Sequence, residues 1–264
     1  MSIPMVMTVA GSDSGGGAGI QADLKTFTAL SVFGTSVIVA LTAQNSYEVA
    51  DILPVNTKFI KSQFDAVLSD MKISAAKTGM LFSREIIETV TEKFREYSIQ
   101  NIVVDPVMVS KSNARLLRED AIDSLLRKLL PISYIVTPNV PEAEILSGMK
   151  ITNEEDAERS AARIYDETGS MALVKGGHLQ GEPVDIFYDG SHFYKFRGIR
   201  INTKNTHGTG DTLSSAIISY VSRGFSTIDA IDMAKKYVEG AIKGSFSTGK
   251  GYGSLCHSWQ FSQC

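Results

Sequence analysis

Short apolar runs alternate with amphipathic helical patterns along almost the whole chain of 264 residues, and this alternation constrains the fold most strongly. Five runs rich in aliphatic residues have the length of strands, at 5–11, 36–41, 101–105, 133–137 and 171–175. They are apolar almost throughout, which is typical of strands that are covered on both faces of a parallel sheet. Between them, apolar residues recur at helical spacing, as at Ile60, Phe64 and Val67. The pattern predicts an α/β fold with a mostly parallel central sheet and helices on both faces.

One segment departs from this rhythm. The stretch "VDIFYDGSHFYKFRG" at 184–198 predicts a β-hairpin that turns at Asp189-Gly190. No low-complexity linker or change in composition marks a boundary, so we expect a single domain over residues 1–264. With 43% hydrophobic and 21% charged residues, the chain has the composition of a globular protein that buries a full core.

The bulk properties exclude several functional classes. A net charge of -3 gives no electrostatic reason to expect binding to nucleic acid or to an anionic membrane. No apolar run approaches the ~18 residues of a membrane span, and "MSIPMVMTVAGSD" lacks the basic and apolar segments of a signal peptide. The only two cysteines, Cys256 and Cys264, both lie in the C-terminal tail, which argues against a disulfide framework. These features predict a cytoplasmic protein.

Three glycine-rich stretches compete as a phosphate-binding loop. The stretch "GSDSGGGAGIQADLKT" at 11–26 follows the first strand, as a dinucleotide fingerprint would, but the frame that starts at Gly15 reaches Ile20 where a third glycine is needed. The stretch "GSFSTGKG" at 244–251 has the frame of a P-loop but ends in Gly251, where a Ser or Thr would hold Mg²⁺. The spacing therefore argues against a dinucleotide site in the first stretch and against a P-loop in the second.

The third stretch, "NTHGTGDTLSSAIISYV" at 205–221, places Gly208, Thr209 and Gly210 immediately before a helical pattern. The first N–H groups of a helix have no partner within the helix, and the helix dipole favours negative charge there. Such a turn suits the anion of a phosphoryl group in transfer. Asp211 then has two interpretations: an ordinary helix cap, or a general base that takes the proton of an incoming alcohol.

Six motifs in order, spread from about residue 5 to residue 258, resemble the hydroxymethylpyrimidine kinase and phosphomethylpyrimidine kinase family of the ribokinase-like superfamily. They are "AGSDSGGGAGIQADLKTF", "KTGML", "DPVMVSKS", "TPNVPEAEIL", "VKGGH" and "NTKNTHGTGDT". The resemblance implies a three-layer αβα sandwich and the transfer of phosphate from ATP with Mg²⁺. The acceptors that it implies are first the pyrimidine alcohol of thiamine biosynthesis and then the monophosphate formed from it.

The resemblance also implies roles for individual residues. Asp211 matches the catalytic base, Gly208 and Gly210 match the anion hole, and Thr209 lies with the residues that bind the nucleotide. Asn139 and Glu142 match an Asn-x-x-Glu motif that organises Mg²⁺ and its waters, although the same spacing also fits a helix capping box.

Two further charged residues are implied beside the phosphates. Asp105 follows the strand at 101–105 and would neutralise phosphate-bound Mg²⁺ through water. Lys175 ends the strand at 171–175 and would add positive charge near the leaving phosphates, with a solvated surface lysine as the alternative.

Gln44 is the residue on which substrate preference depends. Its side-chain amide donates and accepts at once, which complements the ring nitrogen and amino group of an aminopyrimidine. The resemblance further implies that Asp23 accepts a hydrogen bond from the hydroxymethyl group and that Gly11 and Val107 line the ring. Met80 is expected near the ring, with a core methionine as the alternative.

Rival functions stay open at this point. A pyridoxal or pyridoxine kinase of the same superfamily is the nearest, although the presence of Asp211 where many relatives have cysteine disfavours it. A non-catalytic pyrimidine-binding sensor is a rival from another class, and a Rossmann oxidoreductase is a third. The family suggests a homodimer, residues 235–250 are expected to border adenine, and His257 in the tail is expected to be exposed.

Overall fold

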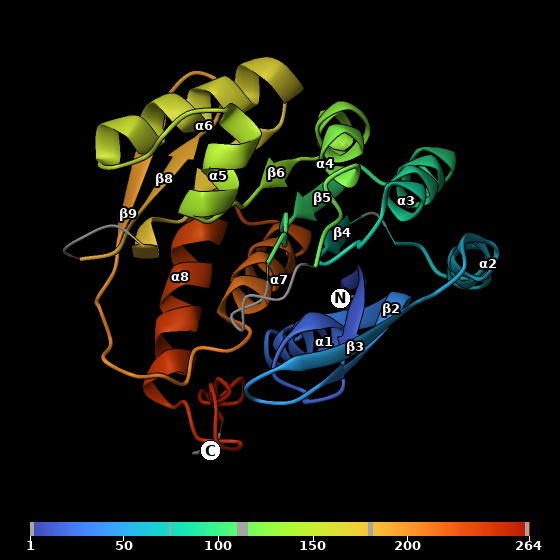
Figure 1. Ribbon diagram of the computed structural model, residues 1–264, viewed down its shortest axis with the longest axis horizontal. Helices are drawn as coiled ribbons and strands as arrows, with labels where there is room; N and C mark the ends of the chain where they lie inside the picture. The colour runs from blue at the N-terminus through green and yellow to red at the C-terminus, as the bar shows by residue number, and fades with distance from the viewer. Residues whose placement is uncertain (1–2, 74, 110–115, 179–181, 262–263) are drawn as a thin grey trace.

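The computed structural model describes residues 3–73, 75–109, 116–178, 182–261 and 264. Its centre is a nine-stranded sheet in the order β3-β2-β1-β4-β5-β6-β7-β8-β9 (Figure 1). The strands are β1 (Met5–Asp13), β2 (Phe33–Gln44), β3 (Val49–Pro54), β4 (Ala75–Thr78), β5 (Asn101–Val104), β6 (Ile135–Val136), β7 (Met171–Val174), β8 (Val184–Tyr188) and β9 (Phe193–Arg197). From β2 to β7 the neighbouring strands run parallel, while β3, β8 and β9 pair antiparallel at the two ends.

Helices cover both faces of the sheet and complete the predicted αβα sandwich (Figure 1). One face carries α2 (Thr57–Leu68), α3 (Arg84–Glu96), α4 (Ala121–Ser124), α5 (Val140–Ser147) and α6 (Glu154–Thr168), whose apolar side chains form one core with the sheet. The other face carries α1 (Gly19–Ala29), α7 (Thr209–Ser222) and α8 (Thr227–Lys243), around a second core that includes Phe27, Ile217 and Tyr237. None of the described helices combines the length and apolarity that crossing a bilayer takes.

The strand order places a crevice between β1 and β4. The chain leaves β1 through α1 toward β2 on one side, and later returns through α2 to β4 on the other side of β1. The connection that leaves the carboxyl end of β4 enters α3, on the face opposite α1, so the connections that follow β1 and β4 diverge at the carboxyl ends of these two strands. In open parallel sheets, ligands bind at this point of divergence. The strand order therefore predicts a ligand site among the residues that follow β1 and β4.

Most predicted elements are present, with two differences. The hairpin of β8 and β9 is confirmed, and Asp189 closes its turn by accepting hydrogen bonds from the amides of Ser191 and His192 at 2.8 and 2.7 Å. The strand predicted at 133–137 is shorter, Ile135–Val136. The edge strand Val49–Pro54 was not predicted, because most of its side chains are exposed and its sequence carries no apolar run.

Phe64 on α2 provides a test of this packing. It is fully buried against the ring of Phe94 on α3, with the ring centroids 5.7 Å apart in an edge-on arrangement. We expect Phe64→Ala to lower the free energy of unfolding by about 3–5 kcal/mol, because the lost contacts leave a cavity between the helix and the sheet. Urea unfolding measures this loss. Phe59→Ala on the same helix is the control, since Phe59 is 58% exposed and its loss should change stability by only about 0.5 kcal/mol. Equal losses for both variants would contradict the packing.

Candidate functional site

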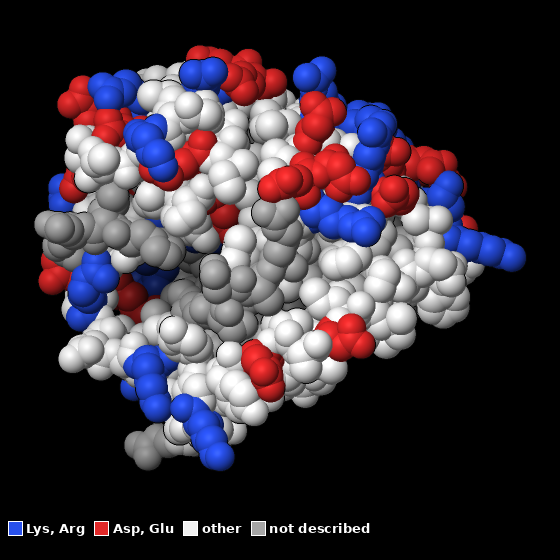
Figure 2. Space-filling model, in the orientation of Figure 1, with Lys and Arg blue, Asp and Glu red and all other residues white. Residues whose placement is uncertain are grey.

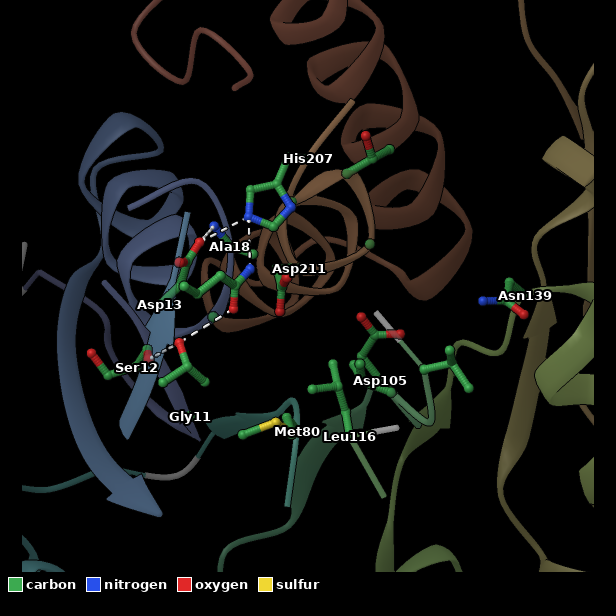
Figure 3. A pocket seen from close by; sticks show the side chains of 18 of the residues that line it. Gly11, Ser12, Asp13, Ala18, Met80, Asp105, Leu116, Asn139, His207 and Asp211 are labelled. Atoms are coloured by element: carbon green, nitrogen blue, oxygen red, sulfur yellow. Dashed lines mark hydrogen bonds and ion pairs between the residues drawn. The ribbon is translucent and has the colours of Figure 1, made fainter. Parts of the chain in front are cut away.

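A cavity of about 170 Å³ opens at the carboxyl ends of β1, β4 and β5. It is lined by the residues that follow these strands and by the turn that starts α7. Figure 3 shows Asp13, His207 and Asp211 on one side of this cavity, with Met80, Leu116 and Asp105 across from them. The predicted residues that line it are Gly11, Gln44, Met80, Asp105, Val107, Asn139, Glu142, Lys175, Gly208, Thr209, Gly210 and Asp211. Segments far apart in the sequence thus meet at one place.

The turn before α7 has the geometry of an anion site. Gly208 is the N-cap residue with φ +83°, and no side chain caps this helix end. A Cβ at Gly208 would lie 1.9 Å from the carbonyl oxygen of Gly17, so only glycine fits in this left-handed turn. The amide of Thr209 donates to the carbonyl of Thr206 at 3.3 Å, whereas the next amides of α7, those of Gly210 and Asp211, lie at the open helix end where a ligand can reach them. The capping interpretation of Asp211 is wrong, because the helix begins at Thr209 and the Asp211 side chain bonds elsewhere.

Asp211 belongs to a buried ion cluster. The Nζ of Lys77 on β4 lies 2.8 Å from the Oδ1 of Asp211 and 2.8 Å from the Oδ1 of Asp23 on α1. Burial would raise the pKa of Asp211, but the charge and hydrogen bond of Lys77 lower it below its usual value. Asp211 also lines the cavity with 14% of its side chain exposed. The carboxylate is thus held ionised at the cavity wall.

Asp23 occupies a different place from the one expected. It is fully buried and accepts hydrogen bonds from the hydroxyls of Thr8 and Ser215 at 2.6 and 2.7 Å, besides Lys77. It is not among the residues that line the cavity. A direct hydrogen bond to a substrate hydroxymethyl group does not fit this placement, because the protein itself surrounds the carboxylate. Sequence reasoning missed Lys77, although a lysine between two alanines and "TGM" was the available signal.

Asp13 and His207 join the two glycine-rich turns. Asp13 accepts hydrogen bonds from the amides of Gly15, Gly17 and Ala18 at 2.8–3.0 Å, and it lies 2.9 Å from the Nε2 of His207. Burial would raise the pKa of Asp13, but the hydrogen bond with His207 and these amides lower it. Neither residue was predicted as part of the site.

Gln44 ends β2 and reaches the cavity beside this pair. Its Nε2 lies 3.2 Å from the Nε2 of His207, and its Oε1 accepts from the hydroxyl of Thr42 at 3.2 Å. His207 thus contacts both a buried carboxylate and the residue expected to recognise the substrate. A histidine directly before the glycine turn was the sequence signal for this role.

Two acidic side chains of the cavity, Asp105 and Glu142, also have hydrogen-bonding partners in the protein. Lys175 donates to the Oδ1 of Asp105 at 2.9 Å and is only 16% exposed, so it is not a solvated surface lysine. Asn139 and Glu142 form the capping box of α5: the amide of each residue donates to the other's side chain, at 2.8 and 3.0 Å. Burial raises the pKa of Glu142 to about 7. Among the described residues, no three acidic, histidine or cysteine side chains gather as a metal-binding group.

Gly11 and Met80 meet at the floor of the cavity. A Cβ at Gly11 would lie 2.5 Å from the Cε of Met80, so the methyl group occupies the space that glycine leaves. Met80 is 8% exposed and packs with Ala40 and Leu116 in a small cluster beside Val107. It therefore belongs to a core and lines the cavity at once.

A second cavity of about 400 Å³ adjoins the first. The two share Asn139, Lys175, Thr209 and Gly210. The far wall of the second cavity comes from α8 and from the segment before α7, including Ile199, Ile201, Lys235, Val238, Glu239 and Ile242. This wall is largely apolar and partly falls in the range 235–250 that was expected to border adenine. Two adjoining cavities on either side of one anion turn suit two substrates that exchange a phosphoryl group.

Comparison with known proteins agrees with this geometry. The family model described as phosphomethylpyrimidine kinase matches residues 13–256. The chain belongs to this family. It is 42% identical to the hydroxymethylpyrimidine/phosphomethylpyrimidine kinase of Bacillus subtilis, over 97% of this chain and 96% of that protein. It is 49% identical to the thiamine biosynthesis bifunctional protein ThiED of Geobacter sulfurreducens, over 96% of this chain but only 52% of that longer protein.

The family membership extends to three-dimensional structure. The crystal structure of an ADP complex of Bacillus subtilis pyridoxal kinase superposes with a TM-score of 0.91 at 34% identity, covering 98% of this chain and 99% of that one. The ribokinase-like sandwich that the motifs imply is thereby confirmed. A kinase of this family accounts for both adjoining cavities.

The C-terminal tail of this kinase differs from expectation. His257 is 6% exposed rather than free in solvent, and its Nε2 lies 3.0 Å from the hydroxyl of Thr212 on α7. That hydroxyl also lies 2.8 Å from the carbonyl of Gly208, and the imidazole bonds to the backbone of Leu255. The two cysteines pair as a disulfide between Cys256 and Cys264 rather than staying free. The tail thus supports the anion turn from behind.

The burial of His257 predicts a specific pH dependence of stability. Burial lowers its pKa to about 4, whereas an unfolded histidine titrates near about 6.5. Between these values only the unfolded state binds the proton, so stability should fall by about 3 kcal/mol as the pH drops from 7 to 4. We expect His257→Gln to lack this part of the pH dependence. Urea unfolding of both proteins at several pH values measures the difference, and parallel curves would contradict a buried neutral histidine.

Proposed function

We propose that this chain transfers the γ-phosphoryl group of ATP to the hydroxymethyl group of 4-amino-5-hydroxymethyl-2-methylpyrimidine. A second transfer to the resulting monophosphate then yields the diphosphate for thiamine biosynthesis. The observation that carries the proposal is the ionised Asp211 carboxylate at the cavity wall, beside the uncapped N-terminus of α7. The kinases to which the chain is similar are named for both phosphorylations.

The nucleotide fits the second cavity. ADP is bound in the similar pyridoxal kinase. Adenine would lie against the apolar wall of α8, and the phosphates would reach the amide of Gly210 and the ammonium of Lys175. The residues here also fit Mg²⁺: Asp105 and Glu142 line the first cavity, and Mg²⁺ commonly binds through one or two carboxylates with waters and phosphate oxygens. The ion would neutralise charge on the phosphates when bound.

The pyrimidine occupies the first cavity in this proposal. Gln44 offers an amide to the aminopyrimidine edge, and the ring lies over Gly11, Val107 and Met80. Asp211 takes the hydroxymethyl proton as the alcohol oxygen bonds to phosphorus and the bond to the leaving ADP oxygen breaks. The amides of the anion turn receive the charge of the migrating group.

The two transfers place different demands on Asp211. An alcohol has to lose a proton, whereas a phosphate monoester with a second pKa of about 6 is already anionic at neutral pH. In the second step Asp211 has no proton to remove. The same carboxylate is therefore essential for one acceptor and dispensable for the other.

A second copy of the chain is the partner that we propose. β3 is an edge strand, and no described strand pairs with its outer side. The surface over β2 and β3 exposes Leu41, Tyr47 and Leu53 by 44%, 53% and 64%. Figure 2 shows few charged side chains over this part of the molecule, compared with the mixed charges over α3 and α4. Contiguous exposed apolar surface of this kind marks protein interfaces. A homodimer through this surface fits these features.

Turnover with three acceptors tests the function. We expect the wild-type protein to phosphorylate the pyrimidine alcohol and its monophosphate, and to use pyridoxal much more slowly. Asp211→Asn should lower kcat for the alcohol by about 100-fold or more, because general-base catalysis is lost, and lower it only a few-fold for the monophosphate. Product formation is measured with each acceptor, with and without Mg²⁺.

The same acceptor assay distinguishes the rival functions. Faster turnover of pyridoxal would identify the chain as a pyridoxal kinase, and no turnover of any acceptor would favour a pyrimidine-binding sensor. Equal losses with both pyrimidine acceptors in Asp211→Asn would remove the base role from this residue.

A charge in the apolar surface tests the dimer. Leu53→Lys should halve the mass seen by sedimentation, because a buried unpaired ammonium opposes association. Phe225→Lys is the control, since Phe225 is 38% exposed at the corner between α7 and α8, away from β3. A wild-type protein that sediments as a monomer at micromolar concentration would contradict the proposal.

A further inference from the structure

Three charged groups from three elements meet beneath the cavity. Lys77 is fully buried in the middle of β4, and its Nζ contacts both carboxylate oxygens of Asp23 at 2.8 and 3.0 Å and one oxygen of Asp211 at 2.8 Å. These three contacts use the three N–H groups of the ammonium. A Cβ at Gly79 would lie 2.9 Å from the Nζ of Lys77 and 3.4 Å from Asp211, so glycine leaves the space in which the two groups meet.

Asp23 lies on the far side of this cluster from the substrate cavity. Its carboxylate is saturated by Lys77, Thr8 and Ser215, and none of it is exposed. A buried carboxylate is costly unless something requires it, because desolvation opposes its charge. A single ammonium and a single Asp211 would already form a neutral pair. The second carboxylate therefore calls for a reason other than neutralising Lys77.

The net charge of the cluster supplies that reason. With both carboxylates ionised, the cluster of Asp23, Lys77 and Asp211 carries a net charge of -1 in a site of low dielectric. When Asp211 gains a proton, the cluster becomes neutral, which is the favoured state in such surroundings. Without Asp23 the same proton would convert a neutral pair into an unpaired buried cation. The presence of Asp23 thus makes proton uptake by Asp211 easier.

We propose that Lys77 and Asp23 are positioning residues for the first transfer. Lys77 fixes the Asp211 carboxylate at the cavity wall, and Asp23 offsets the charge of Lys77 so that Asp211 still accepts the proton of the alcohol. This inference rests on the proposed role of Asp211 as the base, and it assigns to Asp23 an action through Lys77 in place of contact with the substrate.

The directions of the pKa shifts describe how burial and Lys77 act on each carboxylate of the cluster. Burial raises the pKa of Asp23 to about 6 despite Lys77, while Lys77 outweighs burial and lowers the pKa of Asp211. Burial opposes the charge of Lys77, but the two carboxylates raise its pKa, so the ammonium stays charged. The other charged or titratable groups that face the cluster are Asp105 after β5, Lys175 after β7, His207 before α7 and His257 in the tail.

The test is the pH profile of kcat/KM for the alcohol acceptor in three variants. Asp23→Asn removes one negative charge, so we expect its acid limb to move down by about one pH unit. Lys77→Met leaves two carboxylates without their cation, so its acid limb should move up by about two units, with the neutral-pH rate falling at least tenfold. The double variant Asp23→Asn/Lys77→Met again carries a single negative charge, and its acid limb should return to within about half a unit of the wild type.

Two controls separate charge from structure. Ser219→Ala changes a buried residue two turns along α7 from Asp211 whose side-chain hydroxyl donates to the carbonyl of Ser215, and we expect it to leave the acid limb unchanged. The monophosphate acceptor should show no shifted acid limb in any variant, because its transfer needs no base. If Lys77→Met does not fold, as circular dichroism would reveal, Asp23→Asn and the double variant still decide the question.

The outcomes distinguish this inference from the function on which it rests. Opposite shifts in the single variants with recovery in the double variant support the inference. The inference is overturned if the acid limb of the pH profile is unshifted in both Asp23→Asn and the double variant, or if the double variant has a lower kcat/KM than either single variant. Either result would overturn it even when Asp211→Asn discriminates between the two acceptors. If Asp211→Asn fails to discriminate between the acceptors, the base role itself is lost and the inference falls with it.

Discussion

A buried ammonium in the middle of a β-strand is the interaction on which the rest of this structure depends. Lys77 lies in β4, where its neighbours are the apolar strands β1 and β5, and no part of it reaches solvent. Burying such a charge is possible only with well-placed carboxylates, and these come from α1 and α7. The ion cluster therefore fixes two helices against one strand at the point where the cavity opens.

The same constraint explains why the phosphate turn has its particular shape. Asp211 lies three residues beyond Gly208, so holding its side chain at Lys77 also orients the first turn of α7. Gly17 packs directly against Gly208, and Asp13 ties the first glycine turn to His207. An anion site built from bare amides thus draws its rigidity from contacts behind it rather than from a capping side chain.

The two adjoining cavities divide the work of a kinase. One is lined by the strand ends, where we propose that the pyrimidine binds, and the other by the apolar side of α8, and both share residues of the anion turn. The relatives include pyrimidine kinases and a pyridoxal kinase, so this architecture accommodates more than one alcohol. Gln44, the side chain that we propose distinguishes between acceptors, is held beside His207.

Much of the fold was predictable because its signals are local. Continuous apolar runs marked most parallel strands, and Asp189-Gly190 marked the hairpin. Edge strand β3 was missed because an exposed strand at the end of a sheet needs no apolar run. The residues that line the cavity were found mainly from motifs that resemble the kinase family, whereas Lys77 and the pair of Asp13 with His207 were missed because these contacts join positions 54 to 194 apart in the sequence.

The sequence by itself determined the alternation of elements, the glycine turn before α7 and the membership of a kinase family, since each depends on spacing along the chain. Only the tertiary structure decided what Asp23 and His257 do. Asp23 was expected to contact the substrate but is the buried partner of Lys77. His257 was expected to be exposed but lies against Thr212 behind the anion turn. The physical reason is burial: the protonation and partners of a charged group depend on what surrounds it in space, and no local pattern in the sequence specifies that.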